Sequence, residues 1–88
     1  MIRVTTTKNR SRTTITVDGE LSGESVGVVE TCCDQAKSTG GPVKLFLRDV
    51  TAVDKAGQTL LGRLAAKGVL LAARGVYTAY LIQSLASD

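Results

Sequence analysis

Hydrophobic and polar residues alternate with a period of two at the start of the chain. The alternation runs over residues 2–6 and again over residues 13–17, and the polar residues 8–11 separate the two segments. Such alternation, rich in β-branched side chains, is typical of β-strands. We therefore predict two antiparallel strands that form a hairpin at one edge of a sheet.

Helical patterns follow the hairpin. Apolar residues spaced three and four apart predict a helix from about Glu24 to Lys37, which the segment Thr39–Pro42 ends. Asp54 is a good N-cap for a second helix, and Thr78 is expected to cap a third. The faces that we expect to be buried consist of Val26, Val29, Cys33 and Ala36 in the first helix, Leu60, Leu61, Leu64 and Ala65 in the second, and Ala79, Ile82, Leu85 and Ala86 in the third.

Two further strands are predicted between these helices. The nearly continuous apolar run Val43–Arg48 is typical of a central strand, and Val69–Ala72 gives a shorter one. Residues 49–53 are interpreted as a linker in which Val50 and Val53 tuck under the end of the sheet. The predicted fold class is α/β, with the order β-β-α-β-α-β-α. We expect one domain over residues 1–88, with a four-stranded mixed sheet whose antiparallel N-terminal hairpin is followed by parallel βα units.

Composition narrows the possible chemistry. The 88 residues contain no histidine and only 3% aromatic residues, and their net charge is +3. Without histidine the usual general base is missing, so we predict neither an enzyme nor a metal or cofactor site. Few aromatic residues and a modest charge make nucleic-acid binding a weak hypothesis. No signal peptide or membrane-spanning run is visible, and we expect a cytoplasmic protein.

The two cysteines, Cys32 and Cys33, are neighbours in the sequence. The ring that a disulfide between neighbours would close is strained, and no other cysteine is available as a partner. They are interpreted as small apolar residues of the first helix, with a redox sensor as the alternative.

The segment from residue 45 to residue 57 is the most informative part of the chain. An apolar strand ends in a loop, and Val53-Asp54-Lys55-Ala56-Gly57 then opens a helix. This order resembles the signature of STAS domains, the family of anti-sigma factor antagonists. The turn Gly19-Glu20-Leu21-Ser22 is similar to the Gly-x-Leu-Asp turn of that family, and Leu60, Leu61, Leu64 and the segment Gly68–Leu71 fit the same template. The resemblance extends over nearly the whole chain.

The resemblance implies protein binding that phosphorylation controls. In the family, a kinase-like anti-sigma factor docks around an Asp-Ser-Ser-Gly loop and phosphorylates the serine just before the glycine. Here Ala56 stands at that position, Lys55 replaces the preceding small residue, and Ser22 stands where the turn usually carries aspartate. Typical members also continue beyond the third helix, so the chain resembles a shortened form. The resemblance assigns partner binding to Ser22, Asp54, Lys55, Ala56 and Gly57.

From this resemblance we expect a non-enzymatic interaction module without the usual phosphoserine switch. Thr51 and Thr59 are the remaining hydroxyl groups that could accept phosphate in its place. The partner is expected to be an anti-sigma factor or another regulatory or transport protein, and a homodimer is left open. One alternative is an accessory subunit of a lipid-transporting ABC system in the membrane. Another is a small regulator that binds an anion or a nucleotide at the helix start Lys55–Gly57.

Overall fold

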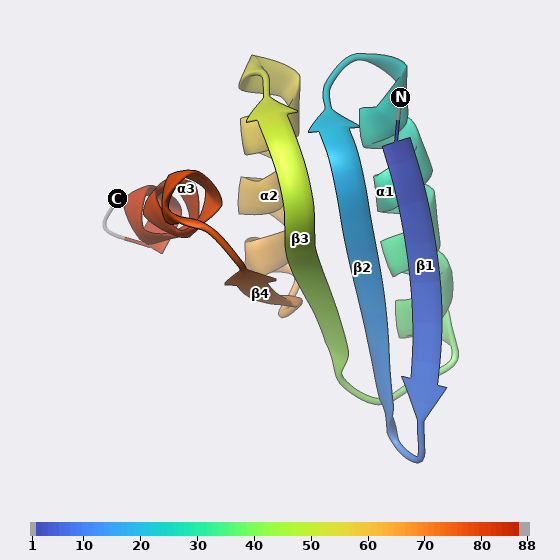
Figure 1. Cartoon of the computed structure of the whole chain (residues 1–88). Helices are drawn as coiled ribbons and strands as arrows, with labels where there is room; N and C mark the ends of the chain where they lie inside the picture. The colour runs from blue at the N-terminus through green and yellow to red at the C-terminus, as the bar shows by residue number, and fades with distance from the viewer. Residues whose placement is uncertain (1, 87–88) are drawn as a thin grey trace.

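The computed structural model describes residues 2–86, except for the side chains of Leu85 and Ala86. The elements follow the order β1 (Ile2–Asn9), β2 (Arg12–Leu21), α1 (Glu24–Ser38), β3 (Val43–Val53), α2 (Lys55–Ala66), β4 (Leu70–Ala73) and α3 (Val76–Ala86) (Figure 1). This is the predicted β-β-α-β-α-β-α order. No helix within residues 2–86 combines the length and the apolar character that crossing a membrane requires.

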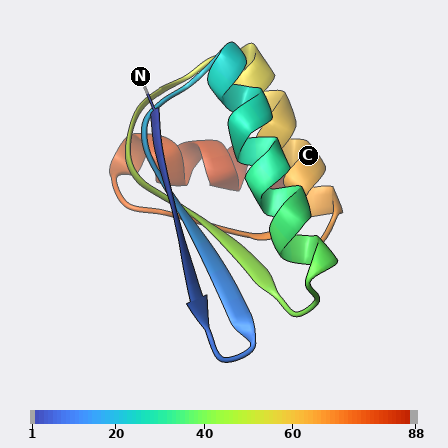
Figure 2. The same cartoon turned by 90° about the vertical axis from the view of Figure 1, so that its right-hand side faces the viewer.

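The strands form one mixed sheet in the order β1-β2-β3-β4. β1 pairs antiparallel with β2, from Ile2↔Gly19 to Asn9↔Arg12, whereas β2 with β3 and β3 with β4 pair in parallel. Figure 2 shows α1 and α2 side by side on one face of the sheet, and in Figure 1 α3 lies beside β4. The predicted α/β class, the mixed sheet and the N-terminal hairpin are therefore confirmed.

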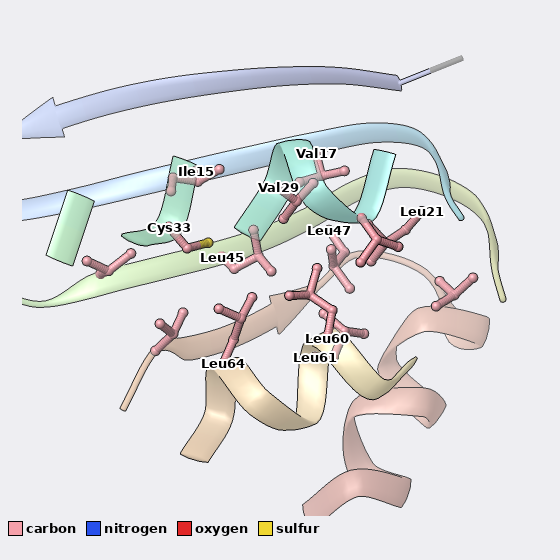
Figure 3. Packing of buried hydrophobic residues seen from close by; sticks show 14 of the residues in the cluster. Ile15, Val17, Leu21, Val29, Cys33, Leu45, Leu47, Leu60, Leu61 and Leu64 are labelled. Carbon is pink, nitrogen blue, oxygen red and sulfur yellow. The ribbon is translucent and has the colours of Figure 1, made fainter. Parts of the chain in front are cut away.

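The hydrophobic core lies between this sheet and the helices α1 and α2 (Figure 3). Alternate residues of β2 and β3 point into it, and the helices contribute the faces that their spacing predicted, except for Ala65, which is exposed. Each large apolar side chain buried here stabilises the fold by about 1.5–3 kcal/mol. The fully buried side chains of this layer are Ile15, Val17, Leu21, Val29, Cys33, Val43, Leu45, Leu47, Leu60, Leu61 and Leu64.

β3 is longer than the sequence indicated. Residues 49–53, predicted as a linker, continue the strand and pair with the last part of β2 up to Leu21↔Val53. Register shifts after Val17 and after Gly19 interrupt the regular alternation, which explains why the pattern did not indicate a strand. Val53 is buried as expected, whereas Val50 is only half-buried.

Thr78 is not the N-cap of α3, because the helix begins two residues earlier, at Val76. Its side chain is instead buried, and its hydroxyl donates a hydrogen bond to the carbonyl oxygen of Arg74 at 3.1 Å. Of the face predicted for this helix, Ile82 is half-buried and Ala79 is exposed. The side chains of Leu85 and Ala86 lie outside the described part of the structure.

Candidate functional site

The helices α1 and α2 begin at the same end of the sheet. Both follow strands that run in parallel, β2 and β3, so the carboxyl ends of the strands and the starts of the helices lie side by side (Figure 1). This arrangement brings the turn at Ser22 and Gly23 next to the segment Asp54–Gly57, about 30 residues later in the chain. Loops at this end of a parallel sheet commonly carry binding sites.

The carboxylate of Asp54 joins the two helix starts. Its Oδ1 accepts a hydrogen bond from the backbone N–H of Gly57 at 2.8 Å, so Asp54 is the N-cap of α2, as predicted. Its Oδ2 accepts a second bond from the N–H of Gly23 at 3.2 Å, and Gly23 is the N-cap residue of α1. One side chain thus satisfies a free amide at the start of each helix.

Backbone contacts also hold the end of β2 against the start of α2. The N–H of Asp54 donates to the carbonyl oxygen of Leu21 at 3.2 Å, and Leu21 itself is fully buried (Figure 3). Gly57 lies against this carbonyl: a Cβ atom there would collide with the Leu21 oxygen and approach Cγ1 of Val53 to 2.8 Å. Glycine is therefore required at position 57 so that α2 can approach the end of β2.

Lys55 and Ala56 are exposed on the first turn of α2. Together with Ser22, Asp54 and Gly57 they form what we call the docking surface. Gly57 is buried and has no side chain, so it shapes this surface only through its backbone. In the described part of the chain, the ammonium group of Lys55 has no ion-pair partner. The surface therefore presents one free positive charge beside an anchored carboxylate.

The side chain of Ser25 holds the backbone of Ser22 in place. The hydroxyl of Ser25 accepts a hydrogen bond from the N–H of Ser22 at 2.9 Å and lies 2.7 Å and 2.8 Å from the carbonyl oxygens of Ser22 and Glu20. The sequence analysis did not single out Ser25. A serine in the first turn of a helix, directly after a glycine turn, is a signal that could have identified it.

The two threonines considered as phosphate acceptors lie on either side of the start of α2. Thr51 is exposed on β3, and its hydroxyl donates to the carbonyl oxygen of Gly19 at 3.4 Å. Thr59 is exposed one turn after Ala56, and its hydroxyl donates to the carbonyl oxygen of Lys55 at 2.9 Å. Neither hydroxyl takes the place that a serine at position 56 would have.

A hollow of about 410 Å³ adjoins the docking surface on the side of β1. It is lined by Ile2, Glu20, Ser22, Glu24, Ser25 and Val28. Val28 is half-exposed, and Glu20 and Glu24 are both exposed, so the hollow combines apolar surface with negative charge. Within residues 2–86, no three His, Cys, Asp or Glu side chains converge in a way that could hold a metal ion.

The cysteines lie on α1, away from this end of the sheet. Cys33 is buried in the core, and burial raises the pKa of its thiol to about 11. Its neighbour Cys32 is half-buried. A thiol with such a raised pKa remains protonated near neutral pH and is a poor nucleophile, which weighs against a redox role for Cys33.

Comparison with solved structures identifies the fold. The chain superimposes over its full length on an anti-sigma factor antagonist from Mycobacterium paratuberculosis, with a TM-score of 0.84, 18% sequence identity and 80% of that chain covered. It also resembles a protein called Mglu, with a TM-score of 0.64 and 20% identity, over 82% of this chain and 19% of the other. No family model matches the sequence, and no curated protein matches it either. The chain therefore has the STAS-type fold of anti-sigma factor antagonists that the sequence resemblance implied.

Proposed function

We propose that the chain is a non-catalytic protein-interaction module that acts in the manner of an anti-sigma factor antagonist. In this proposal residues 1–88 work as one cytoplasmic domain without a cofactor, and the docking surface binds a regulatory protein. The observation that carries the proposal is the carboxylate of Asp54, which holds the starts of α1 and α2 together. A rigid, exposed surface of this kind favours binding to another surface over catalysis, which needs a cleft.

The same carboxylate weighs against an anion or nucleotide site at Lys55–Gly57. Free N–H groups at the start of a helix attract phosphate. Here the N–H groups of Gly57 and Gly23 already bind an internal anion, the side chain of Asp54. A phosphate would have to compete with this carboxylate and would meet its negative charge. Titration with ATP and GTP, followed by calorimetry, should therefore show no binding at millimolar concentrations.

The charge of Lys55 provides the direct test. The tagged chain is purified from its native cells, the partner is identified by mass spectrometry, and its Kd is measured with purified proteins. We expect Lys55→Glu to raise the Kd by roughly threefold to tenfold, because an exposed interface charge contributes modestly and its reversal adds repulsion. The effect should shrink between 50 mM and 500 mM salt as ions screen the charges.

Lys44→Glu is the matched control. Lys44 lies near the start of β3, at the opposite end of the sheet, and forms no ion pair within the described residues. The Lys44→Glu variant should bind the partner as tightly as the wild type does. Equal effects of Lys44→Glu and Lys55→Glu would show a response to net charge alone, and an unchanged Kd for Lys55→Glu would move the interface elsewhere, to the face of α1 around Glu30 and Asp34. Capture of membrane transport proteins would favour the ABC accessory subunit.

The proposal also predicts that no phosphorylated residue around the start of α2 replaces the missing phosphoserine. Position 56 has no hydroxyl group, and the hydroxyls of Thr51 and Thr59 donate hydrogen bonds to the backbone carbonyls of Gly19 and Lys55 respectively. Mass spectrometry of the protein from native cells should find both threonines unmodified. Stoichiometric phosphate on either one would show that the switch has moved to a new residue.

A further inference from the structure

β1 is an open edge of the sheet along its whole length. It pairs with β2 without a register shift, and within residues 2–86 no strand pairs with its other side. Figure 1 shows β1 as the outermost strand of the sheet, with α1 behind it. Neither proline nor a bulge interrupts Ile2–Asn9. The outward backbone N–H and C=O groups of such a strand can pair with a further strand.

The two ends of this edge carry opposite charges. Where β1 begins, Glu20 and Glu24 line the hollow of about 410 Å³ together with Ile2. Where β1 ends, Lys8 and then Arg10 of the hairpin turn provide positive charge. In the described part of the chain, none of these four charged side chains forms an ion pair. On the helix side of the sheet, the edge is thus acidic at one end and basic at the other. Arg3 also lies at the acidic end, but it alternates with Ile2 along β1 and points to the opposite face.

We propose that β1 pairs with β1 of a second copy of this chain, antiparallel, about a two-fold axis at Thr5. Antiparallel pairing brings the basic end of each copy to the acidic end of the other, so the edge is complementary to itself. The product is a continuous eight-stranded sheet with the helices α1 and α2 of both copies on the same face.

The charges select this register. A two-fold axis through the sheet keeps each face on its own side, so opposite residues must share a face. With Thr5 on the axis, Lys8 lies opposite Ile2 of the second copy, and Arg3 lies opposite Thr7. Lys8 faces the helix side of the sheet, because it lines a second hollow there with Cys32 and Gln35 of α1. Its ammonium group therefore reaches the side on which the acidic hollow opens.

The neighbouring register is less favourable. With Thr6 on the axis, Lys8 would lie opposite Val4, two residues or about 7 Å farther from the acidic end. In the Thr5 register no two like charges face each other directly, which removes the usual penalty for pairing edge strands. The dimer also leaves Lys55 and Ala56 free, because they follow β3, two strands away from this edge. Ser22 of the docking surface lines the acidic hollow, so the dimer adjoins that surface, but it does not rest on the proposed function.

Disulfide trapping tests the register. In a background carrying Cys32→Ser and Cys33→Val, Thr5→Cys places the two new thiols opposite each other across the axis. Mild oxidation with copper phenanthroline should convert most of this variant to a covalent dimer on a non-reducing gel. The control Thr7→Cys should remain monomeric, because its two copies lie about 13 Å apart along the strands. Efficient cross-linking of Thr6→Cys or of Thr7→Cys in place of Thr5→Cys would overturn the proposed pairing.

Reversing the charges at the two ends of β1 tests the charge complementarity of the dimer without introduced cysteines. Sedimentation equilibrium of the wild type should show a monomer–dimer equilibrium, and Lys8→Glu should raise its Kd roughly tenfold, because two symmetric contacts are reversed at once. The pair Glu20→Lys and Glu24→Lys should weaken the dimer similarly, and combining all three changes should restore it. Lys44→Glu, away from the edge, should leave the Kd unchanged. A wild type that stays monomeric at millimolar concentration, or a triple variant without recovery, would refute the dimer.

Discussion

Replacing Asp54 with alanine should cost about 2 kcal/mol of folding free energy, because one carboxylate stabilises the starts of two helices. Loss of an N-cap typically costs about 1 kcal/mol, and here the cap bond to Gly57 is 2.8 Å long. The longer bond to Gly23, at 3.2 Å and in an exposed place, adds about 0.5–1 kcal/mol. A domain of this size has a total stability of about 4–13 kcal/mol, so the expected loss is a large fraction.

The variant Asp54→Asn separates the contributions of the two hydrogen bonds that Asp54 accepts. Asparagine retains one carbonyl oxygen, which can still cap α2 through Gly57, but its NH₂ group cannot accept a bond from Gly23. We therefore expect Asp54→Asn to cost about 1 kcal/mol, roughly half of the loss for alanine. Glu20→Ala serves as the control for removing an exposed carboxylate, because the side chain of Glu20 has no ion-pair partner within residues 2–86.

Urea unfolding followed by circular dichroism gives these free energies, provided that the m-value stays constant. In thermal unfolding, 2 kcal/mol corresponds to a Tm lower by about 10 °C. Amide hydrogen exchange provides a local readout: Gly23 should exchange faster in both variants, and Gly57 should be affected mainly by alanine. A wild-type stability of Asp54→Asn would show that the bond to Gly23 contributes nothing, and equal losses for Asp54→Asn and Asp54→Ala would show the same for the cap bond to Gly57. A loss below about 0.5 kcal/mol for alanine would refute the role of Asp54 as the junction.

Two further changes test the packing of the helices. Gly57→Ala should destabilise the fold by about 1–3 kcal/mol, because the new Cβ meets the backbone of Leu21. Its control, Gly27→Ala in α1, has open space around it and should stabilise the fold by up to about 1 kcal/mol through helix propensity. A gain in stability at both positions would contradict the close approach of α2 to β2. The wild type should lose about 2 kcal/mol between pH 9 and pH 11 relative to Cys33→Val, because the pKa of Cys33 is raised to about 11 in the fold. The thiol therefore ionises first in the unfolded chain, and ionisation favours unfolding. Parallel pH profiles of the urea midpoints would contradict this.

Local patterns were sufficient to predict most of the elements. The hairpin of β1 and β2 and the buried stripe of α1 depend on residues close together in the sequence, and both were correct. The second half of β3 was missed because its pairing partner, the end of β2, shifts register twice, and a shifted strand loses its period of two. Thr78 was misassigned because its hydroxyl bonds back to Arg74 within the turn of α3, a bond that leaves no mark in the sequence pattern.

The docking surface was predictable only in part. Asp54 was recognisable as an N-cap because its partner, Gly57, lies three residues away. Its bond to Gly23 spans 31 residues and depends on the parallel pairing of β2 with β3, which no local pattern reveals. The same holds for the contact between Gly57 and the carbonyl of Leu21.

The bridge made by Asp54 also has a consequence for the order of events in folding. The hairpin of β1 and β2 closes a short loop and can form early, whereas the bond from Asp54 to Gly23 requires that α1 has crossed and that β3 has already found β2. Contacts that form after the transition state change the rate of unfolding and leave the rate of folding almost unchanged. The bond from Asp54 to Gly23 should therefore form late in folding. Without it the chain would fold at nearly the same rate and unfold faster.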